Sequence, residues 1–171
     1  MRQLLLIACA AAFSLLAASC ARQPAAADKL AIAVIPKGTT HEFWKSIHAG
    51  AIKAARELDV EIIWNGPLKE DDRESQITVV ENFITRGVNG IVLAPLDNRA
   101  LRRPADEACR AGIGVVIMDS ALDGDSYASF VATDNYAGGR KAGELLAGLL
   151  GGRGRVAMLR YQEGSASTQA R

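Results

Sequence analysis

Residues 30–35 read Leu-Ala-Ile-Ala-Val-Ile, an uninterrupted apolar run. Similar short runs recur downstream, at residues 60–64, 90–94 and 115–118. The segments between them have apolar residues at helical spacing, over residues 41–58, 71–86 and 101–111. Continuous Val/Ile/Leu runs of this length are typical of strands that are buried on both faces of a parallel sheet.

Capping and stop residues support the helical segments. Thr39 or Thr40 is expected to cap the first helix, with Glu42 reaching back to the cap. Gly87 and Gly112 are placed to end the second and third helices. Residues 129–132 and 155–159 read as further strands on either side of a helix over 135–150. The alternation predicts an α/β fold with a doubly wound, mostly parallel sheet and helices on both faces.

The N-terminus has the layout of an export signal. A positive start is followed by an apolar stretch, which is too short for a membrane span, and by small residues. Residues 1–19 are therefore expected to be a signal peptide. Cys20 falls where cleavage is expected and resembles the lipidation site of bacterial lipoproteins, although an ordinary signal peptide is the alternative. The Pro/Ala-rich residues 20–28 read as a tether between the lipid and the fold.

Composition narrows the function class. The 171 residues include 20 basic and 19 acidic side chains, so no basic surplus points to nucleic acid. With 49% hydrophobic residues the chain can bury a core. Cys9 lies in the signal and Cys20 is the lipid site, which leaves Cys109 alone. Cys109 falls in a helical pattern and is expected to be a buried, inert thiol.

In a doubly wound sheet, ligands bind at the carboxyl ends of the strands. Asp119 directly follows the fourth strand, where its carboxylate can accept hydrogen bonds from neighbouring hydroxyls of a polyol; a turn-forming Asp is the alternative. Phe43 and Trp44 are adjacent, so one ring should face the cleft and stack on a sugar, unless both pack on the sheet. His41 is either a hydrogen-bonding partner of the ligand or an exposed residue, and Asn135 is expected near the cleft.

The sequence gives little support for phosphate binding, metal binding or catalysis. Neither Gly138-Gly139 nor the glycine-rich residues 151–154 have the position of a phosphate-binding loop. His41 and His48 lack ligand partners at metal-binding spacing. No nucleophile–base motif stands out. We therefore expect no metal, no cofactor and no enzymatic activity.

An ordered set of segments resembles one protein family. They read IPK at 35–37, FWKS at 43–46, AGA at 49–51, GIVLAP at 90–95, VIMDS at 116–120, VATDN at 131–135 with Gly138-Gly139, and EGSASTQAR at 163–171. These segments are similar to the ribose-binding-protein-like sugar-binding components of bacterial ABC importers, the type I periplasmic binding proteins. The similarity runs from about Lys29 to the end of the chain.

The resemblance implies a sugar held between two lobes that close on a hinge. Phe43 and Trp44 would sandwich the sugar ring, His41 would lie near a position that is often Asn, and Asp119 would hold ring hydroxyls. Ser120 would also contact the ligand, but it replaces an Arg common in ribose binders, so ribose itself is not implied.

Family members are nearly twice this length. Residues 29–171 are therefore expected to be an N-terminal lobe truncated before the second lobe, with a natural single-lobe protein as the alternative. The implied function is a lipid-anchored, periplasmic substrate-binding protein that delivers a monosaccharide to ABC permease subunits. A periplasmic sensor that presents the ligand to a membrane receptor is the alternative.

Overall fold

The computed structural model describes residues 29–171. The predicted signal peptide (1–19), the tether (20–28) and the lipid site Cys20 lie outside the described residues. Among the residues described, no helix combines the length and the apolar character that crossing a membrane would require.

Five parallel strands form a single sheet. In sheet order they are β2 (Glu61–Trp64), β1 (Ala31–Ile35), β3 (Gly90–Leu93), β4 (Gly114–Met118) and β5 (Ser129–Val131). The strand order changes direction between β1 and β3, because β2 lies on one side of β1 and the later strands on the other. The carboxyl ends of all five strands therefore meet at one edge, as the sequence predicted.

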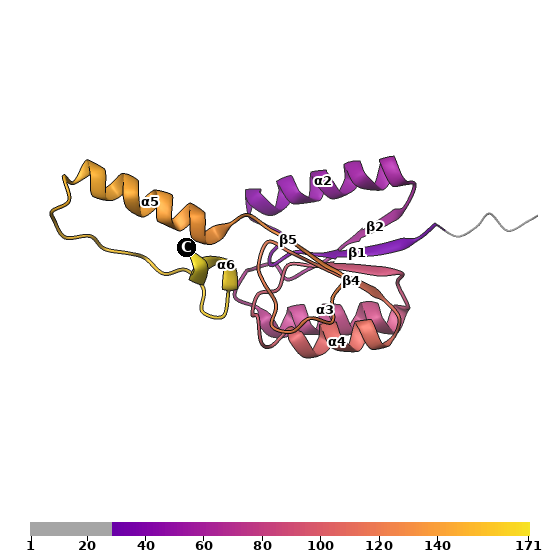
Figure 1. Ribbon diagram of the computed structural model, residues 1–171. Coiled ribbons are helices and arrows are strands. Elements are labelled where there is room, and N and C mark those ends of the chain that lie inside the picture. The colour runs from indigo at the N-terminus through magenta and orange to yellow at the C-terminus, as the bar shows by residue number, and fades with distance from the viewer. Residues whose placement is uncertain (1–28) are drawn as a thin grey trace, which may run out of the picture.

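Helices cover both faces of this sheet, and the predicted fold class is confirmed. Helix α2 (Glu42–Leu58) lies on one face, and α3 (Arg73–Arg86) and α4 (Arg102–Arg110) lie side by side on the other (Figure 1). The main core lies under α3 and α4, where Phe83, Ile91 and Ile117 are almost fully buried. Their burial is the main source of the stability of this layer.

The cap of α2 differs from the prediction. His41, not a threonine, is the N-cap, and its Nδ1 accepts a hydrogen bond from the backbone N–H of Phe43 at 3.2 Å. The hydroxyls of Thr39 and Thr40 instead donate to the carbonyls of Pro67 and Leu68. The threonines thus fasten the β1–α2 loop to the β2–α3 loop.

The predicted strand over 155–159 is wrong. These residues have no regular structure, and Met158 and Leu159 are 87% and 96% exposed. A strand needs a neighbour to pair its backbone, and within residues 29–171 none lies beside this segment. Helix α5 (Asn135–Leu149) extends beyond the sheet rather than covering it, and the chain returns to the sheet edge through α6 (Ala166–Ala170) (Figure 1).

Candidate functional site

Two loops at the carboxyl edge of the sheet are fixed by one buried amide. The Gln76 side chain, from α3, donates to the carbonyls of Pro36 at 3.0 Å and Ala94 at 2.8 Å. Its oxygen accepts from the Leu96 N–H at 2.8 Å. Gln76 is fully buried, so these bonds form out of reach of water and hold the ends of β1 and β3 rigidly.

A buried ion pair lies at this edge. Lys37, two residues after the end of β1, has a side chain only 5% exposed, and its Nζ lies 2.9 Å from Asp119 Oδ2. Lys37 Nζ also donates to the hydroxyls of Ser165 at 3.0 Å and Ser167 at 3.1 Å. The ammonium group is thus surrounded by one carboxylate and two hydroxyls. Asp119 has a positive φ of 64°, a conformation that Asp tolerates better than most residues.

The ion pair opens onto a hollow of about 460 Å³, which we term the strand-end hollow. Of the predicted site residues, Asp119, His41, Phe43 and Trp44 all line it. Its full lining is Lys37, His41, Phe43, Trp44, Glu70, Leu96, Asp119, Tyr161, Gln162, Ser165, Ser167, Thr168 and Arg171. The sequence prediction that the aromatic pair and the carboxylate belong to one edge therefore agrees with the geometry.

The two aromatic rings play different structural parts. Trp44 is 2% exposed, and its Nε1 donates to Glu70 Oε1 at 2.7 Å. Phe43 is 46% exposed and meets Trp44 edge to face, with ring centroids 4.9 Å apart. Phe43 is thus the more exposed of the two rings that line the hollow, and it packs against the buried Trp44. His41 has its Nδ1 committed to the α2 cap, which leaves Nε2 for any other partner.

Ser120 and Asn135 are not among the residues that line the hollow. Ser120 is fully buried, and its hydroxyl accepts the backbone N–H of Ser167 at 2.9 Å. The Asn135 side-chain oxygen accepts from Arg171 Nε at 2.8 Å. Both residues therefore hold the C-terminal segment that forms one wall of the hollow.

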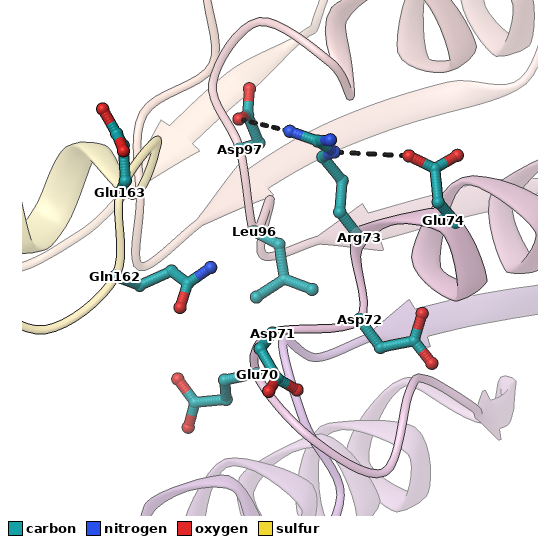
Figure 2. A pocket seen from close by; sticks show the side chains of 9 residues that line it. All are labelled: Glu70, Asp71, Asp72, Arg73, Glu74, Leu96, Asp97, Gln162 and Glu163. Atoms are coloured by element: carbon teal, nitrogen blue, oxygen red, sulfur yellow. Dashed lines mark hydrogen bonds and ion pairs between the residues drawn. The ribbon is translucent and has the colours of Figure 1, made fainter.

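An acidic pocket adjoins the hollow (Figure 2). Arg73 lies between Asp97 and Glu74, at 3.4 and 3.5 Å. Burial acts to raise the pKa of Asp97, but the backbone N–H groups of Ala100 and Arg99, together with Arg73, hold that pKa below its ordinary value. No group of acidic, His and Cys side chains suited to a metal ion occurs in the described part of the chain.

Lys37, Glu70 and Arg171 were given no role by the sequence analysis. A signal for Lys37 was present, because it lies two residues after the end of β1, close to the sheet edge at which Asp119 follows β4. Glu70 and Arg171 gave no such signal. They reach the hollow from a loop and from the end of the chain, and neither follows a strand.

Comparisons with known proteins place this geometry in a family. Residues 32–171 match the periplasmic binding protein domain. The D-ribose/D-allose-binding protein of Pseudomonas aeruginosa is 36% identical over 128 residues, which cover 70% of this chain and 40% of that protein. The D-allose-binding periplasmic protein of Escherichia coli is 31% identical over 147 residues, which cover 81% of this chain and 47% of that protein.

A solved structure shows the same architecture. The carbohydrate transporter solute-binding protein of Agrobacterium radiobacter, in complex with D-arabinose, superposes with a TM-score of 0.79 at 31% identity. The match covers 85% of this chain and 50% of that one, so the chain spans about half the length of its relatives. With a family match over most of its length, the chain belongs to the periplasmic binding protein domain family, among the ribose-binding-protein-like, type I members.

Proposed function

We propose that the strand-end hollow binds a neutral monosaccharide, and that the protein is the substrate-binding component of an ABC importer. The observation that carries the proposal is the shared position of Asp119, Lys37 and Phe43 on one hollow. A carboxylate accepts hydrogen bonds from sugar hydroxyls, an exposed aromatic ring packs on the apolar face of a sugar, and a paired cation leaves the site without a strong charge of either sign.

The named site residues divide into two roles under this proposal. Asp119, His41, Phe43 and Trp44 all line the hollow, and we expect Phe43 to make most of the aromatic contact with the sugar, because Trp44 is only 2% exposed. Ser120 and Asn135 act on the sugar indirectly, by holding Ser167 and Arg171 in the wall. No reaction is proposed, because the function requires binding and release alone.

Relatives favour import over sensing. The solved relative from Agrobacterium radiobacter is a transporter component, and the two curated relatives bind ribose or allose. A sensor would begin with the same binding step. Deleting the gene and measuring uptake of radiolabelled sugar separates the two: import requires the protein for uptake, whereas sensing requires it only for the response.

The binding step is tested by titrating D-allose, D-ribose and D-arabinose into the ¹⁵N-labelled chain and following its amide cross-peaks. Asp119→Asn keeps the shape of the side chain and removes its charge, and we expect it to weaken binding at least about tenfold. Asp71→Asn, on the neighbouring pocket, serves as the matched control. Failure of all three sugars to shift any peak near the hollow, or unchanged affinity in Asp119→Asn, would contradict the proposal.

The family match supports a periplasmic location, and a lipid anchor is a further part of the proposal. We propose that residues 1–19 direct export, that Cys20 carries the lipid and that residues 20–28 tether the fold; residues 29–171 would be the N-terminal lobe of a two-lobe protein. Cys20→Ala should release the protein from the membrane fraction. Membrane retention of a correctly cleaved Cys20→Ala protein would count against lipidation.

A further inference from the structure

We propose that Glu70 is a positioning residue for the strand-end hollow, and that it acts through the indole N–H of Trp44. The inference rests on the proposed function, because positioning matters only if the hollow binds a ligand. Glu70 comes from the β2–α3 loop, whereas Trp44 lies in the first turn of α2. A single bond of 2.7 Å, from Trp44 Nε1 to Glu70 Oε1, joins the two elements.

The loop around Glu70 is held in place independently of that bond. The Thr39 hydroxyl donates to the Pro67 carbonyl at 3.2 Å, and the Thr40 hydroxyl donates to the Leu68 carbonyl at 3.0 Å. A Cβ on Gly38 would stand 3.0 Å from Glu70 Cγ, so any larger residue at position 38 would press on the Glu70 side chain. The carboxylate is therefore delivered to Trp44 by a preformed loop.

An ion pair does not explain the position of Glu70. In the described part of the chain its carboxylate enters no ion pair, although it is partly buried and stands beside the acidic Asp71 and Asp72. Among the described residues, its side-chain hydrogen-bond partner is the indole N–H of Trp44. Its bond to the indole N–H is charge-assisted, and such bonds are about twice as strong as neutral ones.

Anchoring the Trp44 indole also affects the exposed ring of Phe43. Trp44 packs edge to face with Phe43, so fixing the indole also fixes the ring that faces the hollow. An aromatic contact with a sugar depends on where the ring face points. Without Glu70, the indole would lose its only polar anchor among the contacts of the described residues, and the orientation of Phe43 would become less defined.

The test uses the full chain, ¹⁵N-labelled at its two tryptophans, with D-allose as the probe. Trp64→Phe assigns the indole cross-peak of Trp44. We expect Glu70→Gln, which retains a neutral acceptor, to shift that cross-peak, and Glu70→Ala to shift it further. Asp71→Asn removes a neighbouring negative charge without touching Trp44 and should leave the peak in place. An unmoved Trp44 peak in Glu70→Ala would overturn the proposal.

Affinity supplies the second readout. Glu70→Ala should weaken D-allose binding about tenfold and Glu70→Gln about threefold. In a Trp44→Phe background, which has no indole N–H, Glu70→Ala should change affinity less than about twofold. An equal loss in both backgrounds would show that Glu70 acts directly on the sugar and would overturn the proposal.

The two proposals fail in different ways. If the wild-type chain binds none of the three sugars, the proposed function fails, and the cross-peak comparison still decides whether Glu70 orients Trp44. If the cross-peak moves while D-allose affinity stays unchanged in Glu70→Ala, the positioning role fails and the proposed function stands.

Discussion

Lys37 Nζ and Asp119 Oδ2 lie 2.9 Å apart, and this ion pair joins the end of β1 to the end of β4 across the intervening strand β3. The same ammonium group reaches Ser165 and Ser167 in the C-terminal segment. One buried cation thus connects three parts of the chain at the edge where we propose that a sugar binds.

Replacing Lys37 alone should destabilise the fold more than replacing Lys37 and Asp119 together. Lys37→Met leaves Asp119 with a poorly compensated charge, and we expect a loss of about 2–3 kcal/mol in the free energy of unfolding. Asp119→Asn added to Lys37→Met should recover part of that loss, because neither position 37 nor position 119 then carries a charge. Urea denaturation of the four proteins measures the coupling; equal stability of the single Lys37→Met variant and the double variant would contradict it.

Asp97 should make stability depend on pH in the acid range. Burial opposes ionisation of Asp97, but the N–H groups of Ala100 and Arg99 and the Arg73 guanidinium hold its pKa below the usual value. A folded pKa below the unfolded one stabilises the fold above about pH 4, and this contribution is lost as pH falls through the folded pKa.

Two substitutions at Asp97 separate charge from capping. Asp97→Asn keeps an acceptor for the two N–H groups, so its deficit relative to wild type should be largest near pH 6 and should shrink below about pH 4. Asp97→Ala also loses the acceptor and should cost about 1 kcal/mol more at every pH. Urea titrations at several pH values provide the measurement, and a deficit in Asp97→Asn that is independent of pH would contradict the assignment.

Cys109 should react slowly with alkylating reagents. Burial raises the pKa of its thiol, and the negative charge of Asp106 raises it further. The thiolate is the reactive form, so iodoacetamide at pH 8 should modify Cys109 more slowly than a free cysteine. The assay uses a chain in which Cys9 and Cys20 are replaced by Ser.

Asp106→Asn tests the electrostatic part of this explanation. It removes the charge near Cys109 while leaving most of the burial intact, so alkylation should become faster. An alkylation rate in the parent chain equal to that of a free cysteine would contradict the shielding of Cys109.

The sequence predicted the sheet well because its strands are short, apolar and continuous. Residues 30–35 and 90–94 need no knowledge of distant neighbours to be recognised, and the rule that ligands bind at strand ends led directly to Asp119. The same rule extends to Lys37, two residues after the end of β1, for which the sequence predicted no role. These features are local, and local features are readable from sequence.

The features that the sequence did not predict depend on contacts between residues that lie far apart in the chain. Glu70 reaches Trp44 from a different loop, and Ser120 faces Ser167 rather than the hollow. The segment over 155–159 has a strand-like composition, but pairing requires a neighbour that its own sequence does not specify. The sequence likewise left open which of the two rings is exposed; in the structure it is Phe43, and the buried Trp44 donates to Glu70 of a distant loop.

Gly164 should be essential for seating the C-terminal segment against the sheet edge. Its φ is +81°, and a Cβ there would stand 2.3 Å from Asp97 Oδ2. Its carbonyl accepts the Asn98 N–H at 3.0 Å, which docks the segment on the β3–α4 loop. Gly164→Ala should therefore detach residues 162–171, which would appear as faster hydrogen exchange at Ser167, whose N–H is bonded to Ser120.

Gly143→Ala is the matched control for this prediction. Gly143 lies within α5, and a Cβ there would meet nothing within 4 Å. The substitution should leave exchange at Ser167 unchanged and should stabilise α5 by about 0.5–1 kcal/mol, because Gly is a poor helix former. If Gly164→Ala leaves exchange of the C-terminal segment at the rate seen in Gly143→Ala, the close approach of Gly164 to Asp97 does not hold that segment in place, and the contacts with Lys37, Ser120 and Asn135 suffice to hold the wall of the strand-end hollow.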